Sequence, residues 1–366
     1  MLFSFRFVSC FLLALLMARK VSLIFGFISV VGFLWILLVF SSLQIFTRTN
    51  HDDDILDSLI HPTRVYVKNV YGKEVHTFYI DKREHDVLVF VQIPFTGAED
   101  LSTVLQNGLI YGKCRSCKGQ KDCPCYIYSR ESVLFSSIKH PWPCGKYPGL
   151  RTLVECISGS RNLGIRRKPL SKMRYLYMTL LRYPAHHFYH EWNEVKKHGW
   201  PKWSQVPSDK LNHASRECRA MSKGKDVSFK HFTGCPQNPA INRQTQMLAN
   251  MSLDECLSTT KMSERQCYDK MLSSAKDALK HMAFFGITEY SYMTQVLFEE
   301  TFKLKVVGKY VLPPHMHKHM NSSDISREEF EAISTLNKYD FLLYDHALEL
   351  FFERYDTLVT YRVTES

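Results

Sequence analysis

The sequence predicts an α/β fold in which a central parallel sheet is covered by helices on both faces. Three apolar runs, at 86–93, 174–181 and 282–287, have the length and the β-branched or aromatic content of buried strands. Each run is followed by a segment with apolar residues at helical spacing. Strands that alternate with helices are typical of parallel sheets, because the chain needs a crossover to begin the next strand at the same edge.

The first strand leads into an unusual turn. The run 86–93 reads DVLVFVQI, and the turn between it and the next helix spans 96–100. Many nucleotide-binding folds place a phosphate loop here, but the surrounding sequence PFTGAED has one glycine, no lysine and two acids. Glu99 and Asp100 fall in the first turn of the expected helix. The apolar face of that helix carries Leu101, Val104, Leu105 and Leu109.

The second strand, RYLYMTLL at 174–181, ends at Arg182. Pro184 suits the first position of a helix, where the missing amide costs nothing. An arginine at the carboxyl end of a parallel strand, before a helix N-terminus, is a physically sensible phosphate site. The following helix has apolar residues at helical spacing, namely Phe188, Trp192 and Val195.

The remaining sequence completes one globular domain. With 366 residues, 45% of them hydrophobic, the chain can bury a large core. Further helices are expected at 241–251, 267–281, 289–302, 326–336 and 341–352. The expected organisation is a cytoplasmic N-terminus at 1–20, a transmembrane anchor at 21–46, a stem and lead-in at 47–85, the globular domain at 86–357 and a tail at 358–366.

The anchor is expected because residues 21–46 contain no charged side chain. This stretch exceeds the roughly 20 residues that cross about 30 Å of hydrocarbon. Basic residues precede it and the acidic run 52–54 follows, which keeps the N-terminus in the cytosol. A cleaved signal peptide is the alternative, but its apolar region usually spans only about 7–15 residues. We therefore expect a single-pass type II membrane protein with a lumenal domain.

Cysteine usage agrees with a lumenal domain, since ten of the eleven cysteines follow the anchor. The segment 114–125 has the density of either a zinc site or a disulfide cluster. Only five residues separate its two cysteine pairs, whereas four-thiolate zinc sites typically have about 12 or more. Disulfides that also involve Cys144 and Cys156 are favoured, and structural zinc is the alternative. The cluster consists of Cys114, Cys117, Cys123 and Cys125.

The net charge of +11 indicates an anionic partner. Nucleic acid, anionic lipid, nucleotide phosphate and sulfated polysaccharide are candidates, and a lumenal location excludes nucleic acid. A solvated basic surface without a specific partner is the alternative. Glycosylation sequons begin at Asn250 and Asn321, but their use and the oligomeric state are left open by the sequence.

Four stretches, together with the anchor, the first turn and the cysteine-rich insert, occur in a familiar order. They are GQKDCPCY at 119–126, NRQTQMLANMS at 242–252, MAFFGITE at 282–289 and LYDHALELF at 343–351. From about 86 to 355 the chain resembles the heparan sulfate 6-O-sulfotransferases. The resemblance implies a P-loop-like sulfotransferase fold, a protein anchored in the Golgi membrane, and no metal. It also implies sulfate transfer from 3′-phosphoadenylyl sulfate to the 6-hydroxyl of glucosamine residues in heparan sulfate.

The resemblance also indicates which residues bind the donor. The family has a lysine before Thr-Gly-Gly in its first loop; this chain has Phe95 there and keeps Thr96 and Gly97. In the second loop Arg182 is kept, and His186 replaces a serine that binds the donor's 3′-phosphate. Tyr183 replaces the family's acid in the same loop, and Arg243 lies in a matching segment near donor and acceptor. The expected donor-binding residues are Thr96, Gly97, Arg182, His186 and Arg243.

The base of the reaction is altered as well. Tyr147 stands where the family has its histidine base, and a tyrosine with a pKa near about 10 is a poor base. His140 or Lys146 are possible substitutes. General-base catalysis is commonly worth about 10²- to 10⁴-fold and one preorganised donor about 10²- to 10³-fold.

Three hypotheses follow from these changes. The first is an active 6-O-sulfotransferase with rebuilt donor and base sites. The second is a non-catalytic relative that binds heparan sulfate or a partner sulfotransferase. The third is a transferase that uses another donor or acceptor.

Overall fold

The structure is a computed structural model, whose described residues all belong to the unit 59–366 of the chain. The predicted anchor at 21–46, His140, Lys146, Cys144 and Asn321 lie outside the described residues. The described part of the chain contains no helix with the length and hydropathy of a membrane span. It comprises residues 65–68, 74–77, 85–108, 112–114, 125–127, 132–135, 147–159, 173–199, 227–236, 238–311 and 325–365.

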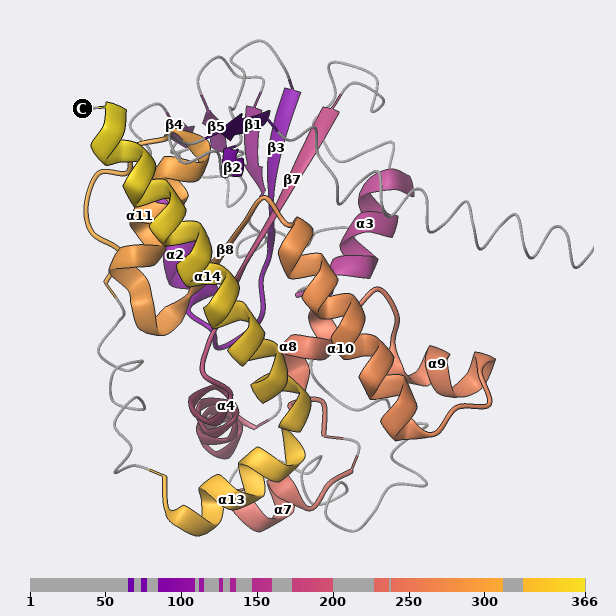
Figure 1. Cartoon of the computed structure of the whole chain (residues 1–366). Coiled ribbons are helices and arrows are strands. Elements are labelled where there is room, and N and C mark those ends of the chain that lie inside the picture. The colour runs from indigo at the N-terminus through magenta and orange to yellow at the C-terminus, as the bar shows by residue number, and fades with distance from the viewer. Residues whose placement is uncertain are drawn as a thin grey trace, which may run out of the picture. The chain divides into compact units, whose positions relative to one another are not determined.

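A six-stranded sheet runs through the described domain in the order β4-β5-β6-β3-β7-β8 (Figure 1). The four strands from β6 to β8 are parallel, which confirms the predicted parallel sheet. The pairs β4-β5 and β5-β6 are antiparallel, a feature that the sequence did not predict because β4 and β5 have three residues each. The strands are β4 Gly112–Cys114, β5 Cys125–Ile127, β6 Ser132–Phe135, β3 His85–Val91, β7 Met173–Leu181 and β8 Phe284–Ile287. A separate antiparallel pair consists of β1 Val65–Lys68 and β2 Glu74–Thr77.

The two central strands are buried along their length. Residues 86–91 of β3 and 175–181 of β7 are all buried. Successive side chains of a strand point to opposite faces, so both faces of these strands are covered. Val91 pairs with Thr179 near the ends of both strands, and Ile287 pairs with Leu181. The loops that follow β3, β7 and β8 therefore leave the sheet at the same edge, where ligands bind in open α/β sheets.

Helices account for most of the remaining described residues. α2, α4, α10 and α13 match the predicted segments, and α4 begins with Pro184 as expected. α8 is shorter than predicted because Asn242 is left-handed, with φ of 50°, and Ala249 is extended. The helices are α2 Ala98–Gly108, α3 Leu150–Gly159, α4 Pro184–His198, α7 Phe229–Thr233, α8 Arg243–Leu248, α9 Leu253–Thr259, α10 Glu264–His281, α11 Ser291–Phe302, α13 Arg327–Leu336 and α14 Lys338–Glu365, with the 3₁₀ turn η4 Thr288–Tyr290.

A disulfide between Cys256 and Cys267 joins α9 to α10. Cys156, which the sequence placed in a disulfide, is disulfide-bonded, as is Cys235. A disulfide that closes a short loop, as Cys256–Cys267 does, typically adds about 2–4 kcal/mol to the free energy of unfolding. α10 itself begins with a capping box in which Ser263 and Gln266 bond each other's backbone amides.

A carboxylate near the start of α14 forms hydrogen bonds to the first turn of α8. Asp340, which is completely buried, accepts hydrogen bonds from the backbone nitrogens of Gln244 at 3.1 Å and Thr245 at 2.8 Å. It also accepts one from Thr245 Oγ1 at 2.7 Å. Burial raises the pKa of Asp340 to about 6, although these hydrogen bonds act in the opposite direction. This carboxyl fixes the helix that carries Arg243 and Gln244 to the site.

The raised pKa predicts a pH dependence of stability. Between about pH 4 and pH 7 the unfolded chain loses the Asp340 proton before the folded chain does, so this group's contribution to folding falls as pH rises. The stability of the wild type relative to Asp340→Asn should decrease over this range, by at most about 3 kcal/mol. Denaturant titrations at both pH values measure it. Asp345→Asn, an exposed position on α14, is the control for removal of an acid. An unchanged or increasing difference would contradict the assignment.

Candidate functional site

Three strand ends meet at the candidate site, and a threonine hydroxyl lies between them. Thr288, the first residue after β8, places its Oγ1 2.5 Å from the carbonyl oxygen of Thr96 and 2.8 Å from that of Leu181. Thr288 is fully buried. It thereby connects the loop after β3 to the end of β7.

The loop after β3 has an unusual backbone. Phe95 has φ of 65° and Gly97 has φ of 82°, both in the left-handed region. A bulky residue such as Phe95 rarely adopts that conformation, which costs on the order of 1–3 kcal/mol. Inside the loop, Thr96 Oγ1 donates to the carbonyl oxygen of Ile93 at 2.8 Å. Such a strained loop persists when its surroundings fix it, and two side chains beyond β7 do so.

The first of these is Arg182, whose side chain is completely buried. Its Nη1 donates to the carbonyl oxygen of Phe95 at 3.0 Å and lies 2.7 Å from His190 Nδ1. A guanidinium has no acceptor, so His190 Nδ1 is unprotonated. The backbone of Arg182 exchanges two 2.9 Å hydrogen bonds with the side chain of Gln244. Burial lowers the pKa of Arg182 to about 10, which leaves it charged at neutral pH.

The second is His187, whose Nε2 donates to the carbonyl oxygen of Pro94 at 2.8 Å. Burial lowers the pKa of His187 to about 3, so the ring is neutral at physiological pH. Sequence reasoning singled out His186, whose half-buried ring lies 5.0 Å from the ring of Tyr183, and missed His187 and His190. Adjacent residues of a helix lie about 100° apart, so the helical period that predicted Phe188 as buried gives no signal for His187.

The ring of Phe95 lies 5.6 Å from that of His190, centroid to centroid. Phe95 itself is half-buried. Phe95, expected at the position of the family's lysine, therefore packs against α4 and gives the loop a third contact.

A carboxylate that sequence reasoning did not identify lies beside Arg182. Glu289, in η4, accepts the backbone amide of Tyr183 and the hydroxyl of Tyr344, both at 2.9 Å. Burial raises the pKa of Glu289, while the nearby charge of Arg182 acts in the opposite direction. The negative charge of Glu289 in turn favours the charged form of Arg182.

Arg243, expected near the donor and acceptor, is engaged by an acid of α4. Its Nε donates to Glu191 Oε2 at 2.9 Å, and its Nη2 donates to the other carboxylate oxygen. Both side chains are buried. This two-point ion pair joins α8 to α4, and a direct contact of Arg243 with a donor stays a prediction.

Tyr147 lies close to α2. Its hydroxyl donates to the carboxylate of Glu99 in α2, and its φ is 62°. The structure thus brings the predicted base position next to the loop that carries Thr96 and Gly97. Within the described residues no group of three His, Cys, Asp or Glu side chains could hold a metal ion.

The parallel strands, with an arginine and a helix N-terminus at their carboxyl edge, form an α/β fold that can bind an anion there. The profile described as "Sulfotransferase family" matches residues 170–347, which contain β7, β8 and the helices around Arg182.

Individual relatives define the family more closely. Heparan-sulfate 6-O-sulfotransferase 1-B of Danio rerio is 35% identical over 276 residues, 74% of this chain and 67% of the relative. Heparan-sulfate 6-O-sulfotransferase 1 of Homo sapiens is 33% identical over 313 residues, 82% of this chain and 75% of the relative. Heparan-sulfate 6-O-sulfotransferase 2 of Gallus gallus is 32% identical over 277 residues, 74% and 68% of the two chains. The chain belongs to the heparan-sulfate 6-O-sulfotransferase family.

The buried ion pair gives a stability prediction. Arg243→Met should lower the free energy of unfolding by about 3–5 kcal/mol, because it leaves Glu191 charged and buried without its partner. Arg243→Met together with Glu191→Leu should cost clearly less, since neither charge is then buried. Denaturant unfolding of the double variant and of each single variant, Arg243→Met and Glu191→Leu, at pH 7 tests this. If the loss of unfolding free energy in the double variant equals the sum of the losses in the two single variants, the two side chains do not interact as described.

Proposed function

We propose that the chain acts on heparan sulfate as a 6-O-sulfotransferase that uses 3′-phosphoadenylyl sulfate as its donor. The observation that carries this proposal is the position of Arg182. It lies between the loops after β3 and β7, at the edge of the sheet where open α/β folds bind ligands. The relatives that are 32–35% identical carry this activity in their names.

Charge and compartment fit the proposed acceptor. The net charge of +11 suits a sulfated polysaccharide. The charge-free segment 21–46 and the disulfide-bonded cysteines support a type II protein with its domain in the Golgi lumen. Glycosylation at Asn250 and Asn321 belongs to the same proposal.

The donor supplies the sulfuryl group, and its phosphate ends would be held by Thr96, Gly97, Arg182 and His186 at the starts of α2 and α4. Tyr183, the N-cap of α4, makes no capping hydrogen bond with its side chain, which suits a helix end that receives an anion. In this structure, however, Arg182 bonds Phe95 and His190, and the carboxylate of Glu99 lies at the start of α2. The chain's own groups therefore fill much of the cradle.

This filling favours a second candidate function. Tyr147 donates its hydroxyl to Glu99, an arrangement unlike that of a base that accepts a proton from a sugar hydroxyl. Loss of the base and of the loop lysine would together leave a very slow enzyme. The second candidate is a family member that binds heparan sulfate or a partner sulfotransferase without transferring sulfate.

Transfer of labelled sulfate decides between the two candidates. The full chain, purified from a secretory-pathway host, is incubated with labelled 3′-phosphoadenylyl sulfate and 6-O-desulfated heparan sulfate. The proposal predicts label at the 6-position of glucosamine, at a rate at least about 10²-fold below that of the human relative because the base is altered. Absence of label, with retention on heparin at physiological salt, would establish the second candidate instead.

A double substitution tests where the chemistry was altered. Phe95→Lys with Tyr147→His places the family's residues in both positions and should raise transfer by about 10²-fold or more. Each single variant serves as a control and should give a smaller gain. No gain from the double variant would show that these two positions are not the altered cradle and base positions.

A further inference from the structure

The contact between Tyr147 and Glu99 joins two parts of the site that are 48 residues apart in the sequence. One part is the start of α2, directly after the loop of Phe95 and Gly97. The other is the position of the base in the family. A contact between these two parts can change the affinity for the donor whether or not sulfate is transferred.

Glu99 occupies a position suited to an anion. It lies in the first turn of the 11-residue helix α2, together with Asp100. The amides at a helix N-terminus favour negative charge, whether carboxylate or phosphate. Two anions at one helix end repel each other, so a phosphate can bind there only if the Glu99 carboxylate turns away.

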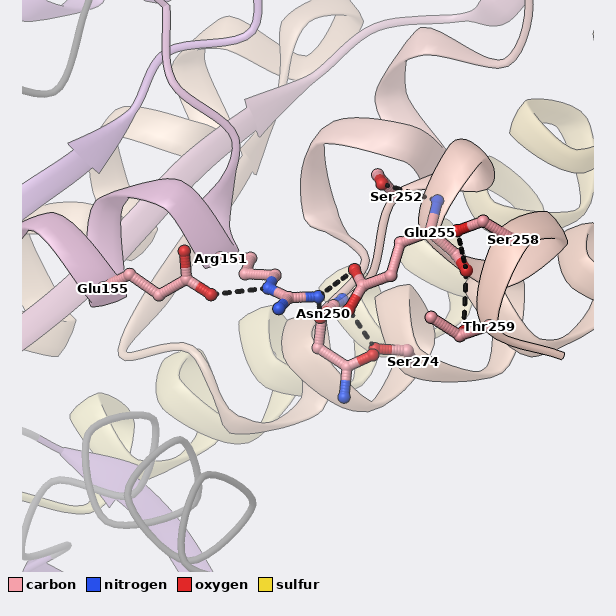
Figure 2. A network of polar contacts seen from close by, with 8 residues as sticks. All are labelled: Arg151, Glu155, Asn250, Ser252, Glu255, Ser258, Thr259 and Ser274. Atoms are coloured by element: carbon pink, nitrogen blue, oxygen red, sulfur yellow. Dashed lines mark hydrogen bonds and ion pairs between the residues drawn. The ribbon is translucent and has the colours of Figure 1, made fainter. Parts of the chain in front are cut away.

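Tyr147 is held in place by the segment that follows it. Arg151, in the first turn of α3, bonds Glu155 at 2.6 Å, the carbonyl oxygen of Asn250 at 3.3 Å and the carboxylate of Glu255 (Figure 2). These contacts fasten the start of α3 to the turn before α9 and to α9 itself. Each pair is more than a third exposed and contributes little stability alone, but together they fix a geometry.

The backbone of the same segment is also tightly packed. A Cβ added at Gly149 would lie 3.1 Å from the carbonyl oxygen of Met247, so α8 and the segment 147–149 approach closely. Tyr147, with its left-handed backbone, is therefore presented to Glu99 by a fixed support.

We propose that Glu99 and Tyr147 determine the donor affinity of this chain by keeping the first loop closed to phosphate. Glu99 takes the place of the anion at the start of α2, and the Tyr147 hydroxyl holds the carboxylate there. Entry of a phosphate requires this hydrogen bond to break. The identity of the donor rests on the proposed function, whereas the closure itself is a property of binding.

Calorimetry with adenosine 3′,5′-bisphosphate, the desulfated form of the donor, tests the closure on the purified full chain. Glu99→Gln should bind this probe about tenfold more tightly than the wild type, equivalent to about 1.4 kcal/mol. Tyr147→Phe keeps the charge of Glu99 but removes its anchor, so it should give a smaller gain. The two gains should not add in the double variant, because both changes remove the same contact.

Asp100→Asn is the matched control, since it removes a neighbouring acid from the same helical turn. A gain as large as that of Glu99→Gln would overturn the proposal, because simple charge repulsion would then explain the effect. Equal affinity of the wild type, Glu99→Gln and Tyr147→Phe would overturn it as well. Tighter binding by Glu99→Gln without sulfate transfer by any variant would leave the closure standing and refute the proposed enzyme activity.

Discussion

The site is organised around the buried guanidinium of Arg182 and the hydrogen bonds that it makes. A fully buried charge costs several kcal/mol unless its donors are satisfied, so the chain must supply partners around it. It does so with the carbonyl oxygen of Phe95, the ring of His190 and the nearby carboxylate of Glu289. These partners come from the loop after β3, from α4 and from the turn after β8. One cation therefore fixes three segments that the sheet delivers to the same edge.

The surrounding polar contacts extend this constraint outward. His187 holds the carbonyl oxygen of Pro94, the pair of Arg243 and Glu191 joins α8 to α4, and Asp340 fastens α8 to α14. Most of these groups are buried, and each is satisfied by another group of the chain. Arg182, one of the residues proposed to bind the donor, is thus bonded to the chain itself.

Sequence reasoning identified the strands β3, β7 and β8 because each is a continuous apolar run between turn residues. It placed Arg182 at the end of its strand and Pro184 at the start of α4 for local reasons that the structure bears out. The partners of Arg182 could not be predicted in this way, because Phe95 and His190 reach it only through strand pairing and helix packing. The Tyr147–Glu99 contact is likewise non-local, and the three-residue strands β4 and β5 are too short to give a periodic signal.

Arg182 holds the loop after β3 in its strained conformation through its hydrogen bond to Phe95. Hydrogen exchange of the backbone amides between 92 and 101, in the wild type and in Arg182→Lys, measures this most directly. A single guanidinium nitrogen, Nη1, contacts both Phe95 and His190, and lysine keeps the charge but replaces the planar guanidinium with a compact ammonium on a side chain one atom shorter. Exchange should be clearly faster in this loop of the variant, with unchanged protection in the middle of β3 and β7. Equal exchange of the loop in both proteins would contradict it.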